Sequence, residues 1–344
     1  MHCHILVPGL FRPQFDGGAA LPRALALETL LARGRRRFGA AASTGTWLMK
    51  SYAVARQRDW PVAPLALLGE GGAPGSDYWV RADPAHLRIH GDRLLLADAG
   101  AFHLSRVEAE ALVESLNSHF SEVFRIFPVQ PNRWYAKLAA APELRTTPLE
   151  DARGQSLNEI LPQGTEAVRW HALMNEIQML LHQHPVNAVR ERQGEAPVNA
   201  MWFWGAGALP AVPTAPFQHV IASDPLARGL ALASGIPAHG LPDSPQAWLD
   251  SNPDSGRALV VLDALSAPAA YGDFQAWRQA LEEMERCWFA PLLAALRQGR
   301  IGMLTLQLVA RQAQLHIETT RSDLRYFWRR REPLAAYLAA PGDE

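Results

Sequence analysis

Short apolar runs alternate with helical stretches along much of the chain. Several runs are bounded by Pro, Gly or polar residues and are typical of buried strands: 4–11, 217–223, 258–265 and 301–309. Leucines recur at helical spacing in 21–37, before Gly34, and a long amphipathic stretch covers 273–299. Strands that alternate with helices predict an α/β fold, a mostly parallel sheet with helices on both faces.

The pattern changes between about residues 85 and 195. Alternating runs on both sides of Gly91 and Asp92 predict a β-hairpin over 86–98. Ser105 is a candidate N-cap, with Glu108 three residues later, for a helix over 105–120. We therefore expect residues 85–195 to form an inserted α+β cap, and 1–84 together with 196–344 to form one discontinuous α/β core.

The run "NAMWFWGAGALP" (199–210) predicts a buried strand with Trp202 and Trp204 on one side and Phe203 on the other. Gly205 and Gly207 are expected to let the backbone turn at the carboxyl end of this strand, where open α/β sheets place their sites. Before it, apolar positions on one helical face of 165–187 predict a helix that stops at Pro185.

Composition narrows the classes of function. The formal net charge is -1, so nucleic acid is an unlikely partner and a membrane surface is not expected. The two cysteines, Cys3 and Cys287, match no disulfide framework, which favours the reduced cytoplasm. No apolar run approaches the roughly 20 residues that span a bilayer.

The order of several motifs resembles archaeal-type cofactor-independent phosphoglycerate mutases. "APGSDYWVRADP" (73–84) resembles the loop that carries their serine nucleophile, and "HPVNAVRERQG" (184–194) resembles the segment that leads to their next strand. Residues 259–293 resemble their second metal-ligand loop and the helix after it. The resemblance implies the alkaline phosphatase-like core with an inserted cap. The "PVN" and "WFWG" segments also resemble the RpfE-type regulatory proteins of proteobacteria, for which the resemblance implies no reaction.

Enzymes of this superfamily need two divalent metals to activate the serine and neutralise the developing charge. Where the resemblance implies Asp and His ligands, this chain has other residues: Gly9, Ser266, Ala270, Leu306 and Gln307. His316 is the one imidazole near the last of these positions, and Asp263 and Asp273 are the nearest carboxylates if the alignment slips. We therefore expect no metal site and no cofactor.

Ser76 and Asp77 stand in the nucleophile loop, either as a vestige of the catalytic site or as a plain turn. Candidate ligand-binding residues between cap and core are His184, Asn187, Arg190, Asn199, Gly205 and Gly207. A structural role in the return from cap to core is the alternative for the first three. His2 and His4 alternate on a strand without a third ligand nearby, and the run Arg329–Arg331 is typical of a solvated surface.

The sequence thus favours a non-catalytic regulatory or binding protein on a phosphoglycerate mutase-like fold. Its expected partner is a protein or a small phosphorylated ligand. The alternative is an active metal-dependent phosphomutase or phosphatase with a displaced metal site.

Overall fold

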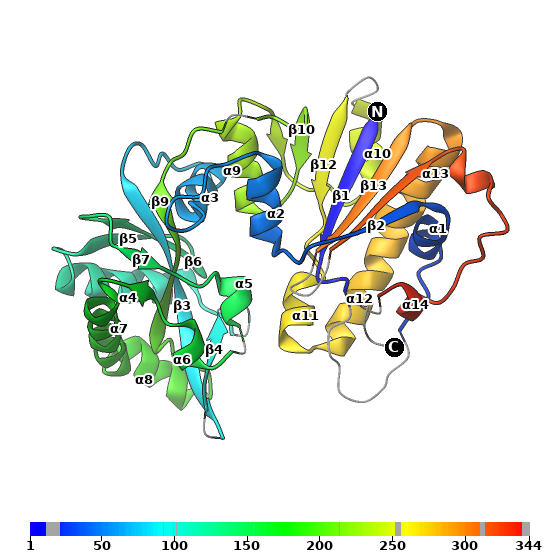
Figure 1. Cartoon of the computed structure of the whole chain (residues 1–344). Coiled ribbons are helices and arrows are strands. Elements are labelled where there is room, and N and C mark those ends of the chain that lie inside the picture. The colour runs from blue at the N-terminus through cyan, green and yellow to red at the C-terminus, as the bar shows by residue number, and fades with distance from the viewer. Residues whose placement is uncertain are drawn as a thin grey trace. The chain divides into compact units, whose positions relative to one another are not determined.

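The computed structural model describes residues 1–11, 21–91, 93–98, 100, 102–153, 155–212, 214–251, 256–309 and 314–338. The chain divides into two compact units, shown in Figure 1. The first unit spans Met1–Ala53 and Val212–Glu344, and the second spans Val54–Ala211. Within the described residues, no helix is both long and apolar enough to cross a bilayer.

A seven-stranded sheet forms the centre of the first unit. Its order is β11-β10-β12-β1-β13-β14-β2, in which the first five strands are parallel and β14 pairs antiparallel with both β13 and β2. The strands are β1 (His2–Pro8), β2 (Arg35–Gly39), β10 (His219–Ile221), β11 (Ala238–His239), β12 (Arg257–Val261), β13 (Met303–Val309) and β14 (Gln314–Thr320). The predicted α/β class with a largely parallel sheet is confirmed.

Helices lie on both faces of this sheet. Cys3, Ile5 and Val7 of β1 pack in one core with α1 (Leu25–Arg33), α12 (Phe274–Met284) and α13 (Ala290–Gln298). On the other face, Trp47 of α2 (Thr44–Ser51) contacts His4, and α2 packs on α9 (Pro225–Ala233). A short π-helix, Glu285–Phe289, joins α12 to α13. The remaining short helices of this unit are α10 (Pro245–Ser251), α11 (Ser266–Tyr271), a 3-10 helix (Asp323–Arg325) and α14 (Ala335–Leu338).

The second unit is built on an antiparallel sheet. Its strands are β3 (Tyr78–His90), β4 (Arg93–Asp98), β5 (Phe124–Gln130), β6 (Arg133–Leu138) and β9 (Ala200–Ala208). Its main helices are α3 (Val62–Gly69), α4 (Arg106–His119), α7 (Ala167–His182) and α8 (Pro185–Arg192). Shorter elements are β7 (Leu144–Arg145), α5 (Leu149–Ala152), α6 (Leu157–Ile160) and β8 (Gln163–Gly164).

Two local predictions for this unit are confirmed. β3 and β4 form the expected hairpin, with Gly91 in its turn at φ +62. Ser105 caps α4 in a full capping box: its side chain accepts from the Glu108 amide, and Glu108 accepts from the Ser105 amide. Asp92, also expected in the turn, lies outside the described residues.

The expectation that β1 and β9 share one sheet is wrong. β9 pairs antiparallel with β3, from Tyr78 opposite Ala208 to Ala85 opposite Ala200, and so belongs to the second unit. The units meet along the chain at 53/54 and 211/212, not at 84/85 and 195/196 as expected. A buried apolar run has the same pattern in a parallel or an antiparallel sheet, so the pattern did not identify the partner strand.

Candidate functional site

The loop after β1 meets the loop after β12 at the carboxyl edge of the parallel sheet. Gly9 has φ +78, and a Cβ atom added to it would lie 2.6 Å from the carbonyl oxygen of Leu265 and 2.9 Å from Cα of Ser266. Ser266 begins α11, and its amide donates to the carbonyl of Asp263. Two of the five positions where the resemblance implies metal ligands, Gly9 and Ser266, are therefore together in space, but Gly9 is held to glycine by its surroundings.

Leu306 and Gln307, two further expected ligand positions, serve the fold. Leu306 belongs to β13, and its side chain is buried in the core. Gln307 Oε1 accepts from Nδ1 of His316 at 3.0 Å, and its amide nitrogen donates to Gln314 at 3.3 Å. Asp273 caps α12 by accepting from the Ala276 amide at 2.9 Å. In the described part of the chain, no three His, Cys, Asp or Glu side chains are grouped so that they could hold a metal ion.

A buried histidine lies on β1, in the amino-terminal half of the strand. His4 is 5% exposed, and neither of its ring nitrogens has a hydrogen-bond partner among the described residues. Its ring centroid lies 5.3 Å from that of Trp47, 5.6 Å from Phe217 and 6.0 Å from His316. Burial, assisted by the neighbouring imidazoles and Arg257, lowers the pKa of His4 to about 3, so its imidazole is neutral near pH 7. A neutral imidazole keeps one N–H, and leaving that donor without a partner destabilises the fold.

His2 lies on the same face of β1. Its Nε2 is 2.7 Å from the hydroxyl oxygen of Thr305, and its ring centroid is 6.2 Å from that of His4. Burial lowers the pKa of His2 as well. The alternation of these two histidines was visible in the sequence, but their partners on β13 and β14 were not.

Ser76 and Asp77 lie in an exposed turn before β3. The turn is held by the Trp79 indole N–H, which donates to the carbonyl of Pro74 at 2.9 Å. Asp77 forms an ion pair with Lys137 at 2.8 Å. Ser76 is exposed, and within the described part of the chain its hydroxyl has no hydrogen-bond partner that could act as a base. Ser76 and Asp77 thus lie in a turn whose contacts are made by Trp79 and Lys137.

Asn187 and Arg190 are buried where α8 returns to β9. The Asn187 amide donates to the carbonyls of Leu181 and Val198 and accepts from the Val198 amide. Arg190, 1% exposed, donates to Glu108 and to the carbonyls of Ala196 and His103, each at 2.8 Å. Protein groups therefore occupy the polar atoms that were candidates for a ligand phosphate.

His184 is the N-cap of α8. Its Nδ1 accepts from the Val186 amide at 3.2 Å, and its Nε2 is 3.0 Å from the Ser115 hydroxyl. Partial burial lowers its pKa. Pro185 is thus the first residue of α8, as well as lying just beyond the end of α7.

Asn199 and the two glycines shape β9. Asn199 bonds both the amide and the carbonyl of Leu87 across the sheet, at 2.7 Å and 3.0 Å. The expected turn at Gly205 and Gly207 is wrong, because β9 continues through both to Ala208. Gly205, at φ +65, lies where the register with β3 shifts, and a Cβ on either glycine would meet Val62 or Pro61 within 2.8 Å.

A buried ion pair next to β9 was not predicted. Arg81 and Asp83 of β3 are 5% and 1% exposed and are joined at 2.6 Å. The Asp83 carboxylate also accepts from the Trp134 amide and from the Trp204 indole. The Arg81 guanidinium lies 4.7 Å from the Tyr135 ring centroid and 5.2 Å from that of Trp204. The only signal in the sequence was two opposite charges two residues apart on an apolar strand.

Comparison with known proteins agrees with the resemblance seen in the sequence. A family model described as 2,3-bisphosphoglycerate-independent phosphoglycerate mutase matches residues 68–187, all within the second unit. The enzyme of that name from Methanosarcina acetivorans is 30% identical over 183 residues, 49% of this chain and 44% of that protein. The probable enzyme from Geobacter sulfurreducens is 28% identical over 218 residues, 60% of this chain and 53% of that protein.

The chain therefore spans about half the length of the curated relatives it matches. Among solved structures, the PH0037 protein from Pyrococcus horikoshii aligns over 93% of this chain and 87% of that chain, with a TM-score of 0.56 and 14% identity. This likeness shows a shared fold. The sequence matches support a relationship with the 2,3-bisphosphoglycerate-independent phosphoglycerate mutases.

Proposed function

We propose that the chain is a non-catalytic regulatory or binding protein built on a phosphoglycerate mutase-like fold. The observation that carries the proposal is the packing around Gly9, where the resemblance implies a metal-binding Asp. A side chain there would collide with the backbone of Leu265 and Ser266, and Ser266 itself replaces a second implied ligand.

The turn of the second unit supports the same proposal. A serine nucleophile needs a base or a metal to remove its proton. Asp77 is instead paired with Lys137, and Ser76 is exposed to solvent. The expected partner is a protein or a small phosphorylated ligand, and the expected compartment is the cytoplasm.

The alternative is an active phosphomutase or phosphatase whose metal ligands lie at other positions. The names of the curated relatives favour it, because they are phosphoglycerate mutases. Asp263 and Asp273 are the carboxylates nearest to the replaced ligands in sequence.

Assays of phosphoglycerate mutase and of generic phosphatase activity test the two functions. The protein and its Ser76→Ala variant are compared with added manganese, magnesium or zinc, and bound metal is measured in the same preparations. We expect no metal-dependent turnover above that of Ser76→Ala. Turnover that disappears in Ser76→Ala, with stoichiometric bound metal, would contradict the proposal and establish the alternative.

A further inference from the structure

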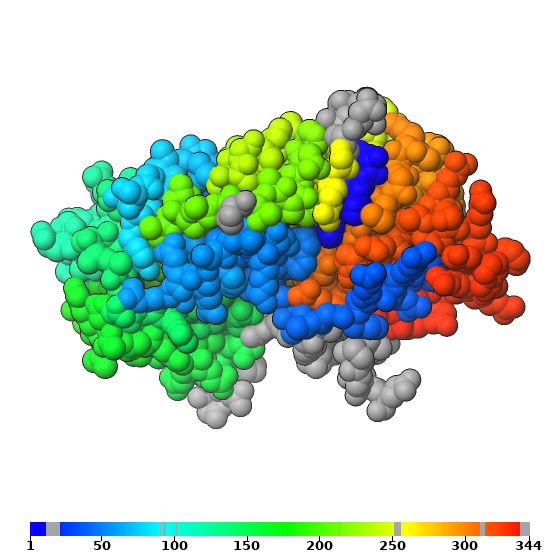
Figure 2. All heavy atoms as spheres, turned by 45° about the horizontal axis from the view of Figure 1, so that its top comes forward, coloured from blue at the N-terminus to red at the C-terminus, as the bar shows by residue number. Residues whose placement is uncertain are grey.

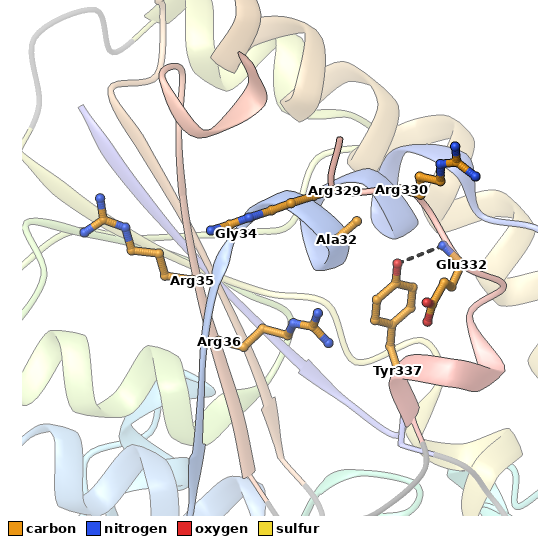
Figure 3. A pocket seen from close by; sticks show the side chains of 8 residues that line it. All are labelled: Ala32, Gly34, Arg35, Arg36, Arg329, Arg330, Glu332 and Tyr337. Atoms are coloured by element: carbon orange, nitrogen blue, oxygen red, sulfur yellow. Dashed lines mark hydrogen bonds between the residues drawn. The ribbon is translucent and has the colours of Figure 1, made fainter. Parts of the chain in front are cut away.

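A basic depression lies in the first unit, and none of the candidate ligand-binding residues named above lines it. It has a volume of about 530 Å³ and is lined by Ala32, Gly34, Arg35, Arg36, Arg329, Arg330, Glu332 and Tyr337 (Figure 3). Its residues come from the junction of α1 and β2 and from the C-terminal segment. Figure 2 shows β2, in blue, at the surface beside the red C-terminal residues.

The fold brings these two arginine runs together at Gly34. A Cβ atom on Gly34 would lie 2.4 Å from Ile317 of β14, so glycine lets the chain pass from α1 directly into the edge strand β2. Arg329 donates to the carbonyl of Arg33 at 3.0 Å, which covers the last carbonyl of α1 and fixes the C-terminal segment beside it.

The floor of the depression is also ordered. The Tyr337 hydroxyl accepts from the Glu332 amide at 2.9 Å, and Tyr337 is 4% exposed. The Arg36 guanidinium carbon lies 5.3 Å from the Tyr337 ring centroid. These contacts hold Arg36 toward the depression from β2, as Figure 3 shows, whereas Arg35 points away from it.

The charge of the depression differs from that of the chain. Its lining has four arginines and one glutamate; without Arg35, which points away, the formal charge is +2, whereas the whole chain carries -1. Among the described residues, neither Arg36 nor Arg330 is paired with a carboxylate. Arg35 is 3.8 Å from Asp323 and remains 72% exposed. Unpaired guanidinium groups at a concave surface bind phosphate oxygens through paired N–H donors.

We propose that this depression binds a linked-phosphate group, such as a diphosphate or triphosphate, free or within a nucleotide. Arg36 and Arg330 contact the phosphates from β2 and from the C-terminal segment, and Arg329 contributes its remaining N–H donors. The volume lies in the range of small-molecule sites. A nucleic-acid strand is disfavoured, because the exposed aromatic side chains of Phe327 and Trp328 do not line the depression.

Calorimetric titration of the whole chain with inorganic pyrophosphate, triphosphate and ATP tests the site. The double variant Arg36→Gln/Arg330→Gln should weaken binding of all three by about tenfold or more, since each neutral side chain loses charge-assisted hydrogen bonds. Equal affinity for triphosphate and ATP would identify the phosphate chain alone as the ligand, and tighter ATP binding would identify a nucleotide. Citrate serves as a carboxylate probe and should bind more weakly than triphosphate.

The matched control is Arg286→Gln/Arg297→Gln, which removes the same charge from exposed positions on other helices of the first unit. It should leave the affinity within about twofold of the unmodified chain. Thermal melting of each variant checks that the fold is retained. An equal loss of affinity in both double variants, or no binding by the unmodified chain, would overturn the proposal. So would binding of a single-stranded oligonucleotide without binding of triphosphate.

Discussion

Gly9 and Ser266 contact each other at the carboxyl edge of the parallel sheet, where a Cβ on Gly9 would approach Cα of Ser266 to 2.9 Å. Gly9→Ala should therefore lower the free energy of unfolding by about 2 kcal/mol or more. The left-handed backbone at φ +78 contributes about 1–2 kcal/mol of this loss, and the collision adds to it. Urea unfolding measures the loss.

Gly272→Ala is the control for this prediction. Gly272 has a similar φ of +68, but no atom lies within 4 Å of the Cβ position. Gly272→Ala should lower the free energy of unfolding by only the contribution of the left-handed backbone, about 1 kcal/mol. Equal losses of unfolding free energy in the two variants would contradict the prediction, because the backbone at Ser266 would then move to accommodate the added methyl group.

The buried His4 should make stability depend on pH. Its pKa is about 3 in the folded chain, against about 6.5 when unfolded, so below pH 6.5 the unfolded state binds a proton that the folded state does not. Stability is full above pH 6.5 and falls as the pH decreases, by about 2 kcal/mol at pH 5. Lowering of the His2 pKa adds in the same direction.

Urea unfolding at pH 7.5, 6 and 5 measures this dependence. His4→Leu removes the titrating group and keeps an apolar side chain between Trp47 and Phe217, so its stability should change less over this range. His316 and Arg257 stay close to His4 in both proteins, so the difference between the two curves is specific to His4. Parallel curves would refute the assignment.

We expect the buried Arg190 side chain to stabilise the second unit. Arg190→Met leaves Glu108 and two backbone carbonyls without their donor and should cost about 3–5 kcal/mol. Arg192→Met, at an exposed position on the same helix, should change stability by no more than about 0.5 kcal/mol. Normal stability of Arg190→Met would instead leave Arg190 available as a ligand-binding residue.

The aromatic residues of β9 should differ in their effects. Trp202→Ala and Phe203→Ala should each cost about 3–5 kcal/mol, because both side chains are 1% exposed. Phe203 packs edge-on against Trp170, with centroids 5.1 Å apart, whereas the Trp202 indole donates to the Thr147 carbonyl. Trp204→Ala should lower the free energy of unfolding, measured by chemical denaturation, by less than the other two variants, because this side chain is only half-buried. Losses of less than 1 kcal/mol at all three would contradict a core role.

Features encoded by neighbouring residues could be predicted from the sequence. The Ser105–Glu108 capping box and the hairpin at Gly91 depend on contacts within a few residues. The alternation along β9 was also predictable, since the register with β3 puts Trp202 and Trp204 on the face of Asp83 and Arg81.

Long-range pairing could not be predicted in the same way. The partner of β9 lies more than 100 residues earlier in the chain, and hydrophobic periodicity does not distinguish β3 from β1 as that partner. The sequence predicts a turn at Gly205, because it does not show that α3 packs against β9 there. Similarly, the sequence makes Arg190 a candidate ligand-binding residue, because it does not show that Arg190 bonds to Glu108, Ala196 and His103.

The edge strand β2 also affects how copies of the chain interact. It is the outermost strand of the seven-stranded sheet, and all five of its residues, Arg35–Gly39, are exposed. Its outer backbone groups could pair with a strand of another molecule, which is a common route to aggregation. Two such strands aligned edge to edge would bring their three consecutive arginines, Arg35–Arg37, close to one another, and this repulsion opposes the pairing. The charge of β2 therefore disfavours edge-to-edge pairing of two copies of the sheet at this strand.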